Sequence, residues 1–150
     1  MSKVAPQLSY WHVWADEQGV THQTRCALSA FQFASVGGRA EPQWNDQLLS
    51  GMACLQFTVL PVGWRGDWHK NPAPQWIAVL SGRWFVETMD GTHVEMGPGE
   101  VSFGGDQDAT PDAQGRVGHR SGTVGNEPCA LLIVQLEAST WAAAKPGIFK

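Results

Sequence analysis

The sequence predicts an all-β fold, a sandwich or barrel built from many short strands. Short β-rich runs are separated by turn signals at a spacing of roughly 8–12 residues, which is typical of such folds. Glycine (17) and proline (9) are frequent among the 150 residues, so turns are expected to be many. No amphipathic helical period of useful length is present. Length alone favours one domain spanning residues 1–150.

The first half of the chain contains three predicted strands. They cover residues 10–14, 21–33 and 52–60, and the last of them is closed by Pro61. The segment 36–48 between them is rich in glycine and polar residues. We therefore expect an irregular loop there.

The second half contains more strands, at shorter intervals. They are predicted at residues 75–80, 83–89, 92–96, 101–103 and 129–136. Asp90-Gly91 is a strong hairpin signal between two of them. The long segment 104–118 has no strand pattern, and loops of this length in compact domains are usually functional or mobile. The tail 139–150 has room for one short helical turn.

Charge and hydropathy restrict the kinds of partner. The net charge is −4 and the isoelectric point is about 5.6, which argues against nucleic acid and against an anionic membrane surface. No apolar run approaches the ~20 residues of a membrane span. The N-terminus shows no apolar signal-peptide core, so a cytoplasmic location is expected. The expected partner is a small-molecule substrate or ligand.

The three cysteines predict neither a disulfide framework nor a zinc site. Cys26, Cys54 and Cys129 are widely spaced, and no CxxC pair is present. We expect each of them to pack as a small apolar residue in a reducing cytoplasm.

An unusual run of polar residues, RGDWHKN, occupies positions 65–71. If this segment is extended, alternate side chains share one face. That face would carry Arg65, Asp67, His69 and Asn71. Trp64 and Trp68 would point the other way, toward a covered surface. The polar face is therefore predicted to line a cavity.

The spacing around this run resembles the first motif of the cupin superfamily. Gly63 is followed after five residues by His69, then after one by Asn71 and after three by Gln75. Six further residues lead to Gly82. The family pattern has histidine at the position of Asn71 and glutamate at the position of Gln75, so the motif is degenerate in this chain.

The second cupin motif is matched in part by the turn Gly97-Pro98-Gly99-Glu100 and by His119 in the segment 118–128. The resemblance covers about residues 50–137, and the chain is similar to small single-domain bacterial cupins. It implies a cupin-type β-barrel, also described as a jelly-roll sandwich, with a core at about 50–137. An N-terminal strand extension would precede it. Such extensions often pair across a dimer, so a homodimer is expected.

The resemblance also implies a divalent metal, usually held in this family by three histidines and one glutamate. The matching positions in this chain are His69, Asn71, Gln75 and His119. Two imidazoles and two amides form a neutral set, compatible with Fe, Mn, Ni, Zn or Cu at reduced affinity. Asp67 or Asp106 could restore a carboxylate. Asp67 is favoured because it lies two residues before His69 on the same predicted face.

Three functions stay open at this point. The first is a metal-dependent enzyme acting on a small organic molecule, as a dioxygenase, lyase or isomerase. In that scheme Asp67 is a base or added ligand, Arg65 orients an anionic group, and loop 104–118 is a lid or rim. The alternative for Arg65, which is slightly favoured, is a salt bridge with Asp67 or Glu87. The second is a non-catalytic small-molecule-binding cupin. The third is a metal-free enzyme that uses a His–Asp pair for acid–base chemistry.

The remaining histidines and two of the eight tryptophans are expected to have structural roles. His12 and His22 are predicted to be surface or packing residues, and His93 to be exposed at the far end of the barrel. Trp76 and Trp84 are predicted to pack on the outer face of the strands or in a dimer interface, with pocket lining as the alternative.

Overall fold

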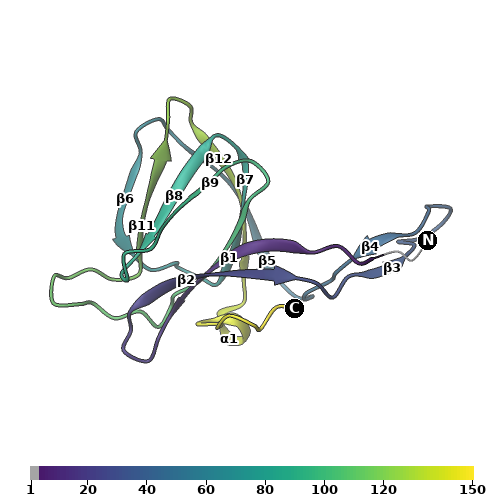
Figure 1. Cartoon of the computed structure of the whole chain (residues 1–150), viewed down its shortest axis with the longest axis horizontal. Helices are drawn as coiled ribbons and strands as arrows, with labels where there is room; N and C mark the ends of the chain where they lie inside the picture. Colours follow the sequence, from purple (N-terminus) through teal and green to yellow (C-terminus); the bar gives the residue numbers. More distant parts are fainter. Residues whose placement is uncertain (1–3) are drawn as a thin grey trace.

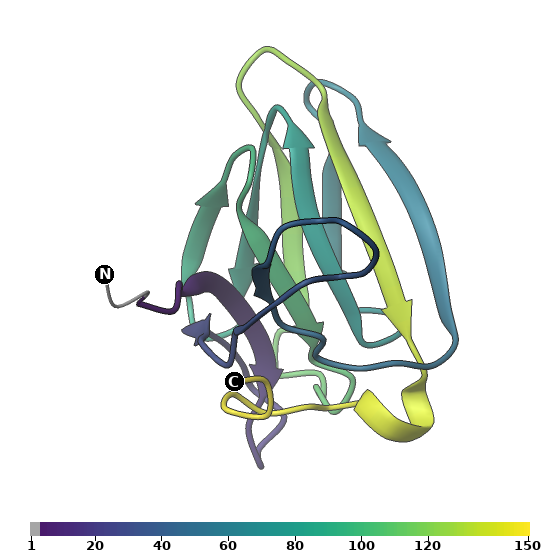
Figure 2. The ribbon, with the colours of Figure 1, turned by 90° about the vertical axis from the view of Figure 1, so that its right-hand side faces the viewer.

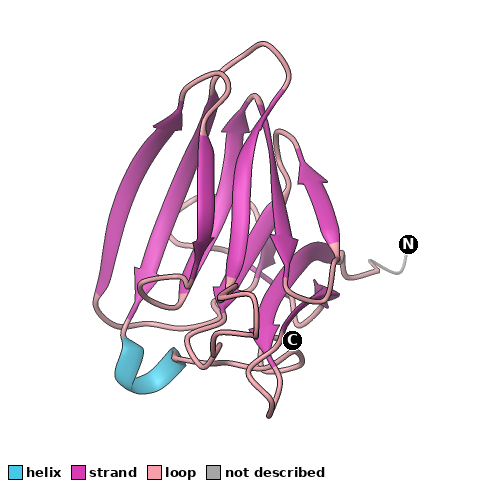
Figure 3. Cartoon of the chain, turned by 90° about the vertical axis from the view of Figure 1, so that its left-hand side faces the viewer, coloured by secondary structure: helices cyan, strands magenta, loops and turns pink. Residues whose placement is uncertain are grey.

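The computed structural model describes residues 4–150, which form two facing β-sheets, a separate two-stranded sheet and one short helix near the C-terminus (Figures 1 and 3). The all-β prediction is confirmed. Residues 1–3, part of the N-terminus in which no signal peptide is expected, lie outside the described residues.

The larger sheet has six strands. In spatial order they are β2 (Thr21–Leu28), β1 (Leu8–Ala15), β10 (Val101–Gly105), β7 (Gln75–Ser81), β12 (Cys129–Leu136) and β5 (Ala53–Leu60). All neighbours are antiparallel except β1 and β10, which are parallel. The predicted N-terminal extension is therefore β1 and β2, which add to this sheet beside β10.

The smaller sheet has four strands and faces the first. Its spatial order is β6 (Arg65–His69), β11 (His119–Val124), β8 (Arg83–Thr88) and β9 (His93–Met96). The hairpin between β8 and β9 turns at Gly91, whose φ of 85° is the left-handed conformation that glycine adopts without strain. The tail begins with α1 (Ala138–Trp141), which agrees with the predicted helical turn.

Three boundaries differ from the sequence predictions. The strand predicted over 21–33 ends at Leu28, and Gln32–Ala34 forms a separate strand, β3. The loop predicted over 36–48 contains β4 (Gln43–Asn45), which pairs with β3 in a two-stranded hairpin. Strand β11 was missed because its sequence, HRSGTV, has few apolar residues.

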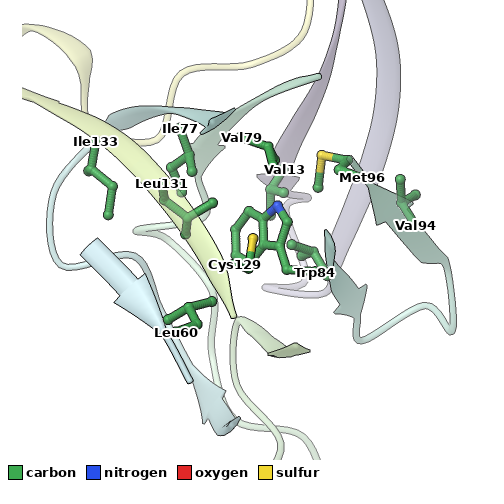
Figure 4. Packing of buried hydrophobic residues seen from close by; sticks show 11 residues of the cluster. Val13, Leu60, Ile77, Val79, Trp84, Val94, Met96, Cys129, Leu131 and Ile133 are labelled. Atoms are coloured by element: carbon green, nitrogen blue, oxygen red, sulfur yellow. The ribbon is translucent and has the colours of Figure 1, made fainter. Parts of the chain in front are cut away.

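The main hydrophobic core fills the space between the two sheets (Figure 4). It contains Val13, Leu60, Ile77, Val79, Trp84, Val86, Val94, Met96, Cys129, Leu131 and Ile133. These residues enter the core because successive side chains of a strand point to opposite faces of the sheet, so that alternate residues face the interior. The preferred prediction for Trp84 is wrong: this side chain is 5% exposed and lies inside the barrel.

A second cluster packs against the outer face of the larger sheet, where the N-terminal strands and the C-terminal tail meet. Tyr10 and Phe103 are fully buried there, Phe149 of the tail covers them, and Trp76 packs beside them. Trp76 is therefore an outer-face packing residue, as predicted. His12 is buried in the same region, where its Nε2 lies 2.7 Å from the Ala144 carbonyl oxygen.

The three cysteines are all free. Cys129 is buried as expected, but Cys54 is exposed, so its predicted packing role is wrong. Within residues 4–150, no helix has the length and apolar character needed to span a membrane.

Candidate functional site

The four residues at the cupin metal positions line one cavity of about 180 Å³ between the sheets. Its polar side is formed by His69, Asn71, Gln75 and His119, with Ser121 and two polar residues of β5 nearby. Its apolar wall is formed by Leu60, Trp64, Ile77, Trp84, Leu131 and Ile133. The prediction that polar residues of the first motif line a cavity is therefore confirmed for His69 and Asn71.

The prediction that Arg65 and Asp67 share this face is wrong. His69 pairs with His119 across β6 and β11, but Ser121 pairs with Gly66, so β6 has one extra residue between these pairs. Such a bulge breaks the alternation of side chains. Trp64 lines the cavity instead of pointing away from it.

Arg65 and Asp67 instead border a separate pocket of about 370 Å³, together with Phe85 and Arg120. The Arg65 guanidinium donates hydrogen bonds from Nη1 to the Trp64 and Thr123 carbonyl oxygens, at 3.0 and 2.9 Å. Arg65 is thus held by the backbone of its own sheet. The catalytic roles predicted for both residues stay predictions, and neither contributes to the wall of the cavity that holds His69.

A chain of hydrogen bonds, which we call the amide relay, runs from β12 to β11. Gln135 Nε2 donates to Gln75 Oε1 at 3.0 Å, and Gln75 Nε2 donates to Asn71 Oδ1 at 2.8 Å. Asn71 Nδ2 then donates to Asp106 Oδ1 at 2.8 Å. Asp106 Oδ2 lies 2.7 Å from His119 Nδ1. The relay ends at the imidazole that borders the cavity.

Local geometry positions the centre of this relay. A Cβ on Gly104 would lie 2.3 Å from Cγ of Asn71, so the amide group occupies space that only glycine leaves open. The Asn71 backbone N–H also donates to Asp106 Oδ1, at 2.9 Å. Asp106 is the first residue after β10, and its place is fixed by these two donors.

Asp106 is an ionised, fully buried acceptor. Burial alone would raise its pKa, but hydrogen bonds from His119 and Asn71 outweigh burial, and the pKa lies below its ordinary value. An ionised carboxylate only accepts hydrogen bonds, so the proton of this contact belongs to His119 Nδ1. In the neutral imidazole the lone pair is then on Nε2, which among the described residues has no hydrogen-bond partner.

His69 has the same tautomer for a similar reason. Its Nδ1 lies 2.6 Å from the backbone carbonyl oxygen of Asp67, which can only accept. The two imidazole rings are 4.6 Å apart between centroids and tilted by 53°. Two imidazoles with available Nε2 atoms therefore meet at the polar end of the cavity.

Gly118 sets the distance between the strands that carry these histidines. Its φ is +75°, and a Cβ there would lie 2.2 Å from the His69 carbonyl oxygen. Its own carbonyl accepts a hydrogen bond from the Thr21 hydroxyl on β2. The loop predicted as a lid thus supplies Asp106 and Gly118 as supports, and residues 107–118 add nothing to the cavity wall as described.

The donor set offers only a weak four-ligand metal centre in this arrangement, because two of its members are neutral amides. Asn71 Oδ1 and Gln75 Oε1 each already accept one hydrogen bond inside the relay, which leaves each oxygen a single lone pair. The buried carboxylate of Asp106 is occupied by His119 and Asn71. Within residues 4–150, no three His, Cys, Asp or Glu side chains come together as a metal-binding group.

Two residues of the relay were not predicted from the sequence in their observed roles. The sequence favours Asp67 over Asp106 as the carboxylate of the site only if side chains alternate strictly along β6. Gln135 was missed, although a single glutamine in the apolar strand CALLIVQL is itself a signal of a buried polar contact.

The other histidines lie away from the cavity. His22 contacts Asp16 at 2.7 Å and Asp90 at 3.0 Å, which joins the β1–β2 turn to the β8–β9 turn. His93 is exposed, as predicted, and stacks on Phe85.

No family model matches the chain, and no curated protein is significantly similar to it. The chain matches solved structures, among them the following three. The Schizosaccharomyces pombe Cnp3 cupin domain is 12% identical at a TM-score of 0.41, covering 99% of this chain and 97% of that domain. A Salmonella typhimurium LT2 protein named for ethanolamine utilization (protein Q) is 14% identical at a TM-score of 0.38, covering 93% and 99%.

Protein NMB1881 of Neisseria meningitidis is 17% identical at a TM-score of 0.40, covering 66% of this chain and 90% of its own. Similarity at this level carries no functional inference. The sheets themselves define the fold class: two facing, mostly antiparallel sheets around a shared core form an all-β, cupin-type jelly-roll barrel with an N-terminal strand extension.

Proposed function

We propose that the chain is a small-molecule enzyme in which His119, oriented by Asp106, transfers a proton to or from a ligand in the cavity. The observation that carries this proposal is the 2.7 Å contact between His119 Nδ1 and a carboxylate that is fully buried. A carboxylate in that position fixes the tautomer and the orientation of the imidazole. It also stabilises the imidazolium that forms when Nε2 takes a proton.

His69 supplies the second proton-transfer group in this scheme. Its Nδ1 is held by a backbone carbonyl oxygen, and its ring stands 4.6 Å from that of His119. If one imidazole starts neutral and the other starts as an imidazolium, a ligand that both rings border could lose a proton to the first and receive a proton from the second, and the two rings would end with their protonation states exchanged. This pairing suits an isomerisation or an elimination, in which a proton leaves one atom and another atom is protonated.

The cavity favours a small, uncharged and largely apolar ligand. A dry cavity of about 150 Å³ holds one benzene molecule, and this cavity measures about 180 Å³. Its wall consists of tryptophan, leucine and isoleucine side chains with a polar end. Among its lining residues the only ionisable groups are the two histidines, so no fixed charge is present to pair with an ionic ligand.

Deuterium exchange tests this proposal without a known substrate. The protein would be incubated in D₂O with a panel of small neutral carbonyl and hydroxy compounds, and incorporation would be followed by NMR. We expect exchange with at least one compound, lost in His119→Asn and reduced at least tenfold in Asp106→Asn. Asp67→Asn, in the separate pocket, is the matched control and should exchange like the wild type.

The possible results separate the three functions. Exchange that survives His119→Asn would contradict the proposal, and exchange lost in Asp67→Asn would restore the catalytic role predicted for that residue from the sequence. Saturable binding of a compound in the cavity without exchange of any compound would favour the non-catalytic binding protein.

A metal held by the two imidazoles is the second candidate. It is favoured by one observation: both Nδ1 atoms are tied to oxygen acceptors, as is usual for histidines that bind a metal through Nε2. Metal content measured by mass spectrometry on untagged protein tests it. Near one equivalent in the wild type and none in His69→Ala would support the metal. No uptake from Fe²⁺, Mn²⁺, Ni²⁺, Cu²⁺ or Zn²⁺ would reject it.

A further inference from the structure

The outer face of the smaller sheet carries a second hollow, which we call the outer pocket. This face points away from the β3–β4 hairpin, which projects to the right in Figure 1 and lies in front of the barrel in Figure 2. The pocket volume of about 370 Å³ lies within the range of roughly 300–1,000 Å³ that is typical of small-molecule sites. It is lined by Arg65, Gly66, Asp67, Phe85, Arg120 and Ser121, of which only Ser121 also borders the barrel cavity.

A β-bulge shapes one side of the outer pocket. Two residues of β6, Asp67 and Trp68, lie opposite Arg120 alone on β11. Both side chains reach the outer side of the sheet: Asp67 borders the pocket, and the Trp68 ring centroid lies 5.6 Å from the guanidinium carbon of Arg120. Bulges of this kind change the direction of a side chain and are frequent next to active sites.

Gly122 opens the middle of the pocket. It pairs with Arg65 of β6 on one side and with Phe85 of β8 on the other. A Cβ at this position would lie 2.6 Å from both Arg65 Nη1 and Phe85 Cε1. Because glycine leaves this space free, the Arg65 side chain lies across β11, with its guanidinium carbon 5.4 Å from the Phe85 ring centroid. Packing therefore fixes the position of this cation.

Arg65 is held in place by neutral groups and has no anionic partner. Its Nη1 donates to the carbonyl oxygens of Trp64 and Thr123, at 3.0 and 2.9 Å. The salt bridge with Asp67 or Glu87 that the sequence favours is wrong, because among the described residues neither carboxylate pairs with Arg65. The Nε and Nη2 donors of Arg65 are thus left available. Together they form one of the guanidinium edges that bind both oxygens of a carboxylate.

Asp67 is the complementary unpaired charge. Its Oδ1 accepts a hydrogen bond from the backbone N–H of Trp68 at 2.8 Å, and its Oδ2 has no partner among the residues that the structure describes. Arg120 does not neutralise it, because Nε and Nη2 of Arg120 both donate to Glu87 Oε2, at 2.9 and 2.8 Å. The outer pocket therefore contains one uncompensated cation and one uncompensated anion.

We propose that the outer pocket binds a free α-amino acid, with the ligand carboxylate on the Nε–Nη2 edge of Arg65 and the ligand ammonium group at Asp67 Oδ2. A simple carboxylate would leave Asp67 unpaired beside a second negative charge. A simple amine would leave Arg65 unpaired in the same way. A small zwitterion pairs both groups at once, and charge-assisted hydrogen bonds of this kind are the strong ones.

NMR titration of the ¹⁵N-labelled wild-type protein gives the first test. The common L-amino acids would be added one at a time, and we expect at least one of them to bind with a dissociation constant below about 1 mM. The shifted amides should lie in β6 and β11 around the outer pocket. The methyl ester and the N-acetyl derivative of that amino acid should each bind at least tenfold more weakly, because each keeps only one of the two charges.

Three results of this titration would overturn the proposal. One is the absence of saturable shifts with every amino acid. Another is equally tight binding of either blocked derivative. The third is a set of shifts confined to residues that line the barrel cavity. None of these comparisons needs a variant, so the titration is decisive even if a substitution at Arg65 prevents folding.

Variants then assign the two contacts. Arg65→Lys keeps the charge but loses the planar fork, and it should weaken binding at least tenfold. Asp67→Asn should weaken binding by a similar factor. The control is Arg83→Gln, two residues before Phe85 on β8, where the guanidinium pairs with Glu95 at 3.9 Å; it should bind like the wild type. Unchanged binding in Arg65→Lys or in Asp67→Asn would contradict the proposed contacts.

The outer pocket and the barrel cavity can be tested separately. Asp67 lies outside the barrel cavity, so Asp67→Asn should lose amino-acid binding and keep the deuterium exchange proposed for His119. His119→Asn should show the opposite pattern. Amino-acid binding lost in His119→Asn and kept in Asp67→Asn would place the amino acid in the barrel cavity and reject the outer pocket as its site.

Discussion

Asp106 and His119 form a buried pair in which the carboxylate Oδ2 lies 2.7 Å from the imidazole Nδ1, with 0 and 7% of the two side chains exposed. The same carboxylate accepts two hydrogen bonds from Asn71 through its other oxygen. One buried charge thus holds the imidazole of one sheet and a loop of the other. Its protonation state should affect stability as well as proton transfer.

Replacing Asp106 by asparagine should destabilise the protein by about 2 kcal/mol at pH 7, the usual cost of losing hydrogen bonds to a buried charge. The pKa of Asp106 is lowered in the folded state, so its contribution is complete above the ordinary value of 3.8. It is lost as the pH falls through the lower, folded pKa. Denaturant unfolding at pH 7 and at successively lower pH checks this.

The control for this series is Asp108→Asn, two residues further along the same loop, where the side chain is exposed. It should change the free energy of unfolding by less than about 0.5 kcal/mol. If the free energy of unfolding that Asp106→Asn loses relative to the wild type stays the same in strong acid, the ionised carboxylate is not the stabilising group.

Gly118→Ala should destabilise the protein and disturb the histidine pair. The new Cβ would lie 2.2 Å from the His69 carbonyl oxygen, so β6 must shift. Gly115→Ala is a matched control, since Gly115 has a similar φ of +79° but no atom within 4 Å of the added Cβ. We expect the control to lose about 1 kcal/mol of free energy of unfolding, because alanine is strained in the left-handed backbone conformation. Gly118→Ala should lose at least twice as much. Equal losses in chemical denaturation would contradict the close approach.

Gln75→Glu should break the amide relay at its centre. The carboxylate cannot donate to Asn71 Oδ1, so two acceptors would face each other at a side chain that is 6% exposed. The expected cost is about 1–3 kcal/mol at pH 8, and it should diminish at pH 5, where a protonated glutamate donates again. Melting temperatures across this range measure the effect.

Gln56→Glu provides the control for the relay, because Gln56 borders the same cavity from β5 but is exposed. Among the described residues, its side chain bonds only to Thr58. It should melt like the wild type at both pH values. If added Ni²⁺ or Zn²⁺ raises the melting temperature of Gln75→Glu more than that of the wild type, the metal hypothesis is strengthened. An equal response would weaken it.

His22 should make a pH-dependent contribution through its two aspartates. Burial lowers its pKa, but the hydrogen bonds to Asp16 and Asp90 outweigh burial, and the pKa is raised above 6.5. The stabilisation is therefore complete below pH 6.5 and is lost as the pH rises through the raised pKa. The melting temperature of His22→Gln should fall furthest below the wild type near pH 6 and approach it near pH 9.

His93→Gln is the comparison for His22, because the nearest carboxylate oxygen of His93 is 3.6 Å away, on an exposed face. Exposed ion pairs of this kind contribute little to the free energy of unfolding. A difference between wild type and His22→Gln that grows with pH would contradict the expected loss of stabilisation at high pH.

The sequence was informative about the barrel because β7 and β12 are short, nearly continuous apolar runs bounded by turn signals, which is typical of strands in a sandwich core. It was not informative where this signal is lacking. Strand β11 turns His119, Ser121 and Thr123 toward the interior, and β3 and β4 belong to no sheet of the barrel. Neither condition is visible as an apolar run in the sequence.

The site was predictable in part from the spacing of the motif residues. Motif spacing brought His69, Asn71, Gln75 and His119 to one cavity, although they come from distant segments. The bulge in β6 was not predictable, since the extra residue is defined only by pairing with β11. That single residue moved Asp67 out of the site and left Asp106 as the buried carboxylate next to the histidines.

The amide relay also has a mechanical consequence. It starts on β12 and β7 of the larger sheet and ends on β11 of the smaller one, so it spans the gap that the cavity occupies. A motion that separates the two sheets must stretch or break one of these hydrogen bonds, and the bond between Asp106 and His119 is the one that orients the imidazole. Opening the barrel would therefore change the orientation of the group that we propose to transfer the proton.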